Sequence, residues 1–383
     1  MKDEKGIGGR PMEEKTVPVR EGEALDGEKL IRFLREHIAG VADAPVEVRQ
    51  YPTGASNLTY LIRIGEWEAV LRRPPLGPLP PKAHDMEREA TILQKIHPVF
   101  PLAPKPYAIC RDTSVLGAVF YVMERRQGVV IDGTFPPGVH PTPDLCRRIS
   151  EAAVDTLVKL HDIDWREAGL ASIGRPAGFL ERQVNGWIAR YDKAKTDDDP
   201  EAEPLIRWLS DNVPESSELT VIHNDYKLNN MLWNPKDVAE PVAVLDWEMT
   251  TIGDPLFDLA AALSYWARPE DPEELIHVLP NVTTYSGFFS RVLLWGTGTS
   301  PAPSCRCFGG GGKTVDWRVN RSRSPAGEPR RPPGIVPRFT PSSTVIWKRS
   351  GDGPSHRLQQ WVSLGHDVNR PSLTIFRIDE KIE

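Results

Sequence analysis

The pattern of apolar and polar residues predicts a strand-rich region over residues 26–125 that also contains two helices. The first helix starts after Asp26, which can cap it, and strands alternate over residues 46–73. A second helix is predicted over residues 83–96, and residues 117–124 form an apolar strand that ends in an acid. The first helix has its apolar residues on one face: Leu30, Phe33, Leu34 and Ile38.

A more helical region follows over residues 126–290. Pro143 suits the first turn of a long helix, and residues 178–193 predict a second amphipathic helix. His161 ends the long helix, and a single histidine there is interpreted as structural. The long helix has one apolar stripe: Leu145, Ile149, Ala152, Ala153, Leu157 and Leu160.

The candidate chemistry lies in residues 221–258, where polar residues follow the ends of two short strands. His223, Asp225 and Asn230 follow the strand end Val221–Ile222 in the spacing H-x-D-x4-N, and a second strand runs directly into Asp246. In magnesium-dependent phosphoryl transfer, one Asp takes the proton of the acceptor hydroxyl while an Asn and another Asp hold the metal. A single acid at a strand end would be an ordinary loop residue, but this combination points to that chemistry.

These motifs carry a resemblance to a known family. The runs HNDYKLNN, VLDWE and GDPLFDLA resemble the aminoglycoside phosphotransferase and choline-kinase-like family, and most closely the kinase domains related to those fused to acyl-CoA dehydrogenases. The resemblance implies an α+β, bilobal protein-kinase-like fold, with a small antiparallel-sheet N-terminal lobe and a mainly helical C-terminal lobe. It also implies that Asp225 is catalytic, that Asn230 and Asp246 bind Mg²⁺, and that His223 and Asp258 support the catalytic loop.

The resemblance further implies ATP as the phosphoryl donor and assigns residues of the first region to it. Arg72 would hold the phosphates and pair with Glu89, and the backbone at Met123 would meet the adenine edge. An exposed charge is the alternative for both Arg72 and Glu89. A turn that would fold over the phosphates, or else be a simple hairpin turn, contributes Gly54, Ser56 and Asn57.

Composition excludes several other classes of protein. The net charge of −6 gives no general reason to expect nucleic-acid binding, and no apolar run is long enough to span a membrane. The charged first residues lack the apolar segment of a signal peptide. Four cysteines in 383 residues fit a reducing compartment, so we expect a cytoplasmic protein.

The two ends of the chain differ from the rest. Residues 1–25 are polar and are predicted to be a disordered tail. Residues 291–383 are rich in proline, glycine and arginine, with 15 Lys and Arg against 7 Asp and Glu. This segment could be a disordered tail or a nucleic-acid-binding arm. We favour a shifted reading frame that has removed or replaced the C-terminal helices after about residue 290.

The sequence therefore predicts an ATP- and magnesium-dependent phosphotransferase that acts on a hydroxyl of a small molecule. The residues do not identify the acceptor or the oligomeric state, although the likeness to domains linked to acyl-CoA dehydrogenases suggests a hydroxyacyl compound. The alternative is a non-catalytic nucleotide-binding module, inactivated by the altered C-terminus. Binding of nucleic acid is the less favoured role.

Overall fold

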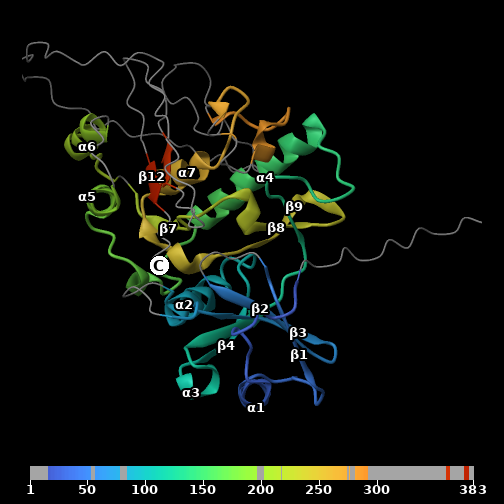
Figure 1. The fold of residues 1–383 in the computed structure, drawn as a ribbon. Helices are drawn as coiled ribbons and strands as arrows, with labels where there is room; N and C mark the ends of the chain where they lie inside the picture. Colours follow the sequence, from blue (N-terminus) through green and yellow to red (C-terminus); the bar gives the residue numbers. More distant parts are fainter. Residues whose placement is uncertain are drawn as a thin grey trace, which may run out of the picture. The chain divides into compact units, whose positions relative to one another are not determined.

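A computed structural model describes residues 16–52, 57–77, 84–195, 202–216, 218–273, 276, 281–291, 359–362 and 375–378. The chain divides into two compact units, Met1–Arg126 and Gln127–Glu383 (Figure 1). No helix in the described part of the chain is long and apolar enough to cross a membrane.

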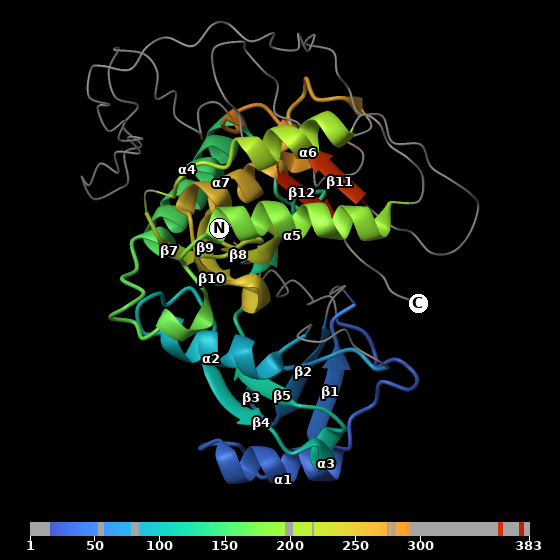
Figure 2. The ribbon, with the colours of Figure 1, turned by 90° about the vertical axis from the view of Figure 1, so that its left-hand side faces the viewer.

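The first unit is built on a five-stranded antiparallel sheet with the strand order β1-β2-β3-β5-β4 (Figure 2). The hairpin between β2 and β3 turns at Gly65, whose φ of 60° is readily reached only without a Cβ atom. The strands are β1 (Val46–Gln50), β2 (Leu58–Ile64), β3 (Trp67–Arg73), β4 (Pro106–Cys110) and β5 (Phe120–Glu124).

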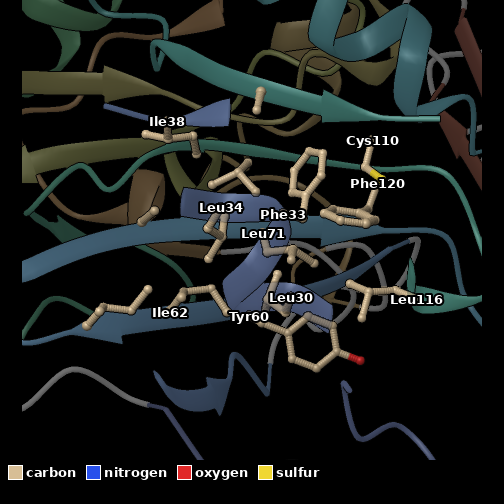
Figure 3. Packing of buried hydrophobic residues seen from close by; sticks show 14 of the residues in the cluster. Leu30, Phe33, Leu34, Ile38, Tyr60, Ile62, Leu71, Cys110, Leu116 and Phe120 are labelled. Carbon is tan, nitrogen blue, oxygen red and sulfur yellow. The ribbon is translucent and has the colours of Figure 1, made fainter. Parts of the chain in front are cut away.

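One face of this sheet packs against helix α1 (Gly27–His37) (Figure 3). The Asp26 side chain accepts a hydrogen bond from the backbone N–H of Lys29, so the expected cap is present. The four apolar helix residues expected to share a face are all buried. Their partners on the sheet include Tyr60, Ile62 and Leu71, and alternate residues of β2 therefore form one continuous core.

Two predicted boundaries in this unit differ from the structure. The apolar strand begins at Phe120 rather than at residue 117, because Gly117 ends the short helix α3 (Thr113–Leu116) in a left-handed conformation. Helix α2 (Met86–Ile96) is capped by Asp85, while residue 83, its predicted start, lies outside the described residues.

The described part of the N-terminal segment is attached to the sheet. Val17 forms a β-bridge with Gln50, and the Gln50 side chain accepts a hydrogen bond from the Arg20 backbone at 3.0 Å. The Tyr60 hydroxyl donates to the carbonyl of Glu23 at 2.9 Å. The expectation of a disordered tail is therefore wrong for residues 16–25, because hydrogen bonds at the sheet and the packing of Val19 and Leu25 against the core hold this segment.

The second unit contains the two helices that the sequence predicted, from Pro143 and over residues 178–193, together with two others. Helix α4 begins with Pro143 after the Thr142 cap, and His161 is its last residue. Its buried residues include Ile149, Ala153, Leu157 and Leu160 of the predicted stripe, whereas Leu145 and Ala152 are only half-buried. The helices are α4 (Pro143–His161), α5 (Phe179–Ala194), α6 (Ala202–Asp211) and α7 (Pro255–Ser264).

Short strands and 3-10 turns connect these helices and carry the candidate site. The sheets have the orders β6-β8-β9 and β10-β7, and all pairs are antiparallel. The strands are β6 (Val129–Val130), β7 (Thr220–Ile222), β8 (Met231–Asn234), β9 (Asp237–Val244) and β10 (Thr251–Gly253). The 3-10 turns are η1 (Ala171–Ile173), η2 (Leu228–Asn230), η3 (Trp247–Met249) and η4 (Asn281–Thr284).

Arg291 is packed into the second unit, although the sequence assigned it to the basic segment. Its Nε donates to the Trp266 carbonyl at 2.8 Å, and its two terminal nitrogens contact the two oxygens of Asp271 at 2.9 and 2.5 Å. Arg291 is thus part of the folded second unit. Beyond Arg291 the described residues form strands β11 (Gln359–Val362) and β12 (Ile375–Ile378), which pair antiparallel.

Candidate active site

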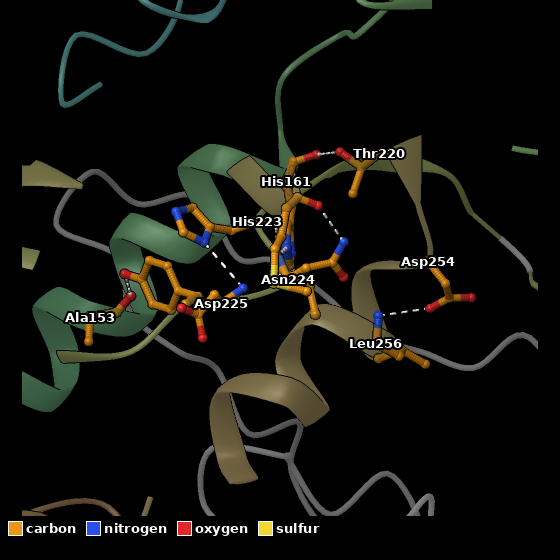
Figure 4. A network of polar contacts seen from close by, with 11 residues as sticks. Ala153, His161, Thr220, His223, Asn224, Asp225, Asp254 and Leu256 are labelled. Atoms are coloured by element: carbon orange, nitrogen blue, oxygen red, sulfur yellow. Dashed lines mark hydrogen bonds and ion pairs between the residues drawn. The ribbon is translucent and has the colours of Figure 1, made fainter. Parts of the chain in front are cut away.

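The loop that follows β7 is fixed through its backbone. The carboxylate of Asp258, on α7, accepts the backbone N–H of His223 at 2.8 Å and that of Asn224 at 2.7 Å. Asn224 has a φ of 66°, a left-handed conformation that Asn tolerates better than most residues, and its side chain donates to the Met249 carbonyl. Figure 4 shows His223, Asn224 and Asp225 following one another on this loop. The expected hydrogen bonds between Asp258 and the loop are present.

Asp258 is a fully buried carboxylate that stays ionised. Burial raises its pKa, but the hydrogen bond from His161 Nε2 at 2.9 Å and the backbone N–H of His223 lower it further, so that the pKa lies below its usual range. The Thr220 hydroxyl donates to the His161 carbonyl (Figure 4). His161 thus supports Asp258, in line with its structural interpretation.

His223 links Asp225 to the strand that precedes Asp246. Its Nε2 lies 3.0 Å from the Leu245 carbonyl, which can only accept, and its Nδ1 lies 3.3 Å from the Asp225 N–H, which can only donate. These two contacts fit a ring that carries a proton on Nε2 and a lone pair on Nδ1. Both ring nitrogens therefore hold backbone groups in place: the carbonyl of Leu245 and the N–H of Asp225.

Donors surround the carboxylate of Asp225, which is only 4% exposed. Its Oδ1 accepts from the Tyr265 hydroxyl at 3.0 Å. Its Oδ2 contacts Lys227 Nζ at 2.9 Å and accepts from Asn230 Nδ2 at 2.8 Å. Sequence reasoning assigned no role to Tyr265. Lys227 is largely buried, with 15% of its side chain exposed.

Asn230 and Asp246 lie at adjoining ends of β8 and β9. The N–H of Leu245 donates to the carbonyl of Asn230 at 2.8 Å, so Asp246 directly follows a residue bonded to Asn230. The Asn230 side chain donates to Asp225 through its amide nitrogen, so its amide oxygen takes no part in that contact. Oxygen ligands of this kind fit Mg²⁺, which proteins hold through one or two carboxylates together with substrate phosphates. No cluster of three or more His, Cys, Asp or Glu suited to a metal occurs among the described residues.

In the first unit, Arg72 and Glu89 form a buried ion pair. Leu71 faces the core with α1, so alternation along β3 directs Arg72 to the opposite face, where it meets Glu89 of α2. Tyr121 stands opposite Arg72 in the register of β3 and β5. Burial and the Glu89 charge raise the pKa of Tyr121 well above its usual value, against the effect of Arg72.

The other predicted nucleotide residues have separate positions in this unit. Asn57 is buried, and its Oδ1 lies 2.9 Å from His84 Nδ1. Met123 is buried in β5, which pairs with β3 on one side and β4 on the other. Gly54 and Ser56 lie outside the described residues.

A largely apolar pocket adjoins Asp225 in the second unit. Its empty volume is about 570 Å³, including the part open to solvent, and Lys227 and Tyr265 line it on the side of Asp225. Apolar residues of α4, α7 and η4 form other parts of its wall: Ala153, Leu157, Leu259, Ala262, Leu263 and Val282.

These features define a phosphotransferase with a protein-kinase-like, α+β fold: the antiparallel sheet with its buried Arg–Glu pair, and the loop that bears Asp225 and Asn230. A crystal structure of a Ralstonia eutropha protein, provisionally described as an aminoglycoside phosphotransferase, shares this fold. It matches with a TM-score of 0.60 and 27% identity over 71% of this chain and 78% of that chain. The profile of the "Phosphotransferase enzyme family" matches residues 47–279, and the chain belongs to that family. The resemblance seen in the sequence is confirmed.

Curated relatives carry a matching region within much longer proteins. Acyl-CoA dehydrogenase family member 10 of Mus musculus is 35% identical over 260 residues, or 67% of this chain and 24% of that protein. Acyl-CoA dehydrogenase family member 11 of Homo sapiens is 38% identical over 251 residues, or 64% of this chain and 32% of that protein. The chain therefore spans about a quarter to a third of the length of these relatives.

Proposed function

We propose that this chain transfers the γ-phosphoryl group of ATP to a hydroxyl group of a small molecule. The observation that carries the proposal is the Asp225 carboxylate, which Tyr265, Lys227 and Asn230 hold in one position at the edge of a pocket. Phosphoryl transfer demands little covalent chemistry from a protein, so the positioning of such a base is a large part of catalysis.

In the proposed reaction, the acceptor oxygen forms a bond to the γ-phosphorus and gives its proton to the Asp225 carboxylate. The bond from the γ-phosphorus to the bridging oxygen breaks, and ADP leaves with that oxygen. Lys227, next to Asp225, is placed to offset negative charge near the acceptor. Asn230 and Asp246 would hold Mg²⁺, which neutralises phosphate charge when it is bound.

The nucleotide is assigned to residues of the first unit. Arg72 would hold the α- and β-phosphates, since a guanidinium binds phosphate in a bidentate manner. Glu89 would fix the direction of that guanidinium through their buried ion pair. The turn at Gly54, Ser56 and Asn57 and the backbone at Met123 complete the proposed ATP site.

We also propose an acceptor with an uncharged hydrocarbon part, such as a hydroxyacyl compound. The pocket beside Asp225 supports this choice because its described lining residues include no Asp or Glu. A polycationic aminoglycoside would call for carboxylates at that position. The relation to proteins named acyl-CoA dehydrogenase family members points in the same direction.

The test measures ADP formation from MgATP with a panel of short-chain hydroxyacyl-CoA thioesters, and with kanamycin as the cationic comparison. Asp225→Asn should lower turnover by at least about 100-fold, because a positioned general base contributes that much or more. The variant should keep the thermal stabilisation by MgATP, which is about 2.7 kcal/mol at 100 times the Kd. Asp211→Asn, at an exposed position on α6, is the matched control.

Two outcomes would contradict the proposal. Full turnover in Asp225→Asn would remove Asp225 from its role as base. Stabilisation by MgATP without ADP formation with any acceptor would favour the non-catalytic nucleotide-binding module.

A further inference from the structure

Tyr265 contacts both charged side chains of the catalytic loop. Its hydroxyl donates to Asp225 Oδ1 at 3.0 Å, and Lys227 Nζ lies 4.7 Å from the centre of its ring. Lys227 Nζ in turn contacts the other oxygen of Asp225 at 2.9 Å. One aromatic side chain thus joins the proposed base and its neighbouring cation, by a hydrogen bond and a cation–π contact.

The position of Tyr265 is set by helix α7. Its backbone N–H donates to the Ala262 carbonyl at 3.2 Å, which continues the last turn of the helix. Asp258, seven residues earlier, lies two turns away on the same side of α7, a rise of about 10 Å. The helix therefore holds the catalytic loop at two points: Asp258 binds its backbone, and Tyr265 binds the side chain of Asp225.

A second contact is needed because an aspartate side chain is not fixed by its backbone alone. The last torsion of Asp is broad, so its two oxygens can rotate unless separate donors hold each of them. In this site Lys227 and Asn230 contact Oδ2, and Tyr265 contacts Oδ1. The phenol is a neutral donor, and it can hold Oδ1 without adding a second positive charge beside Lys227.

We propose that Tyr265 is a positioning residue of the transfer reaction, which holds the Asp225 carboxylate in the orientation that receives the acceptor proton. The ring also holds the Lys227 ammonium beside that carboxylate and forms part of the wall of the acceptor pocket. This inference rests on the proposed function. It adds a residue whose hydroxyl and ring have separable roles.

Tyr265→Phe separates the two roles, because it removes the hydroxyl and keeps the ring, the cation–π contact and the pocket wall. We expect kcat for ADP formation from MgATP to fall about 10- to 100-fold, since small misplacements of a catalytic group cost that much. The KM for ATP and for the acceptor should stay within about twofold, because the lost interaction serves the transition state. A purely structural role would not produce this split.

The measurement uses the full chain with MgATP, first with water as the acceptor and then with the hydroxyacyl-CoA panel. Tyr285→Phe is the matched control, because Tyr285 is 48% exposed and its ring contact with Phe135 does not require the hydroxyl. Thermal unfolding of both variants shows whether a lower rate reflects lost folding, and a Tyr265→Phe midpoint well below that of Tyr285→Phe would contradict a positioning role.

The outcomes separate this inference from the proposed function. A kcat within about twofold of wild type in Tyr265→Phe, together with loss of turnover in Asp225→Asn, would overturn the role of Tyr265 and leave the function standing. No ADP formation by folded, nucleotide-binding wild-type protein would overturn both.

Discussion

Asp258→Asn should open the loop at residues 223–225 locally. The carboxylate accepts three hydrogen bonds, from the backbone of His223, the backbone of Asn224 and the ring of His161. The new amide keeps the shape but has only one oxygen. If that oxygen serves Asn224, the NH₂ group faces two donors in a fully buried position.

The expected loss of stability of the loop follows from counting those donors. The His161 ring can change its tautomer and accept from the amide, but the backbone N–H of His223 cannot change. At least one charge-assisted hydrogen bond is therefore lost and one buried donor is left unpaired, which costs about 2 kcal/mol, rising to about 5 kcal/mol if His161 does not adapt.

Hydrogen exchange of the His223 and Asn224 amides is the direct assay, because a two-unit chain need not unfold in one step. A loss of about 2 kcal/mol corresponds to roughly 30-fold faster exchange at these amides. The control Asp211→Asn changes an exposed carboxylate and should leave the exchange unchanged. Exchange within about threefold of wild type would refute the reasoning, since the two N–H groups would then not depend on the carboxylate.

The Asp258 carboxylate should also make the free energy of unfolding depend on pH. The pKa of Asp258 is lowered in the folded protein, so its contribution is fully present above the ordinary Asp value of about 4. The contribution is lost as the pH falls through the lower, folded value. The difference in stability between wild type and Asp258→Asn should therefore shrink below about pH 4, as urea unfolding at several pH values would measure. A constant difference across that range would contradict the linkage.

Two further predictions concern buried ion pairs. Glu89→Gln removes the charge that faces buried Arg72, so it should destabilise the first unit by about 3 kcal/mol in urea unfolding and raise the KM for ATP. The control Glu87→Gln, at an exposed position, should lower the free energy of unfolding by less than about 1 kcal/mol. Arg291→Ala removes a bidentate carboxylate partner and a bond to a backbone carbonyl, and should cost the second unit about 3 kcal/mol. The exposed Arg207→Ala should cost almost nothing, and equal effects of the two arginine substitutions would contradict a structural role for Arg291.

The sequence predicted those parts of the molecule that depend on local pattern or on motif spacing. The helix capped by Asp26 follows from periodicity, and the contact of Asp258 with the loop was implied by the family motif. The roles of the site residues in catalysis, the nucleotide, the acceptor and the cytoplasmic location remain predictions.

Other features depend on contacts that no local pattern encodes. Tyr265 reaches Asp225 across 40 residues because of where α7 ends, and nothing in the residues around it signals a polar contact. Residues 16–25 bind the sheet through a short β-bridge, scattered hydrogen bonds and two isolated apolar residues, Val19 and Leu25, which form no periodic pattern. Gly117 is the left-handed end of the short helix α3, and the apolar run that follows it gives no sign of that helix. The predicted strand therefore started too early.

The ion pair of Arg291 with Asp271 also bears on how the gene could change. Asp271 lies within the family match over residues 47–279, and Arg291 lies 12 residues beyond the end of that match. A shift of reading frame upstream of codon 291 would delete this arginine and leave a half-buried carboxylate without its partner. A shift just downstream would preserve the pair whatever peptide followed. Comparing the gene on both sides of this codon with the genes of related organisms would therefore test the reading-frame hypothesis.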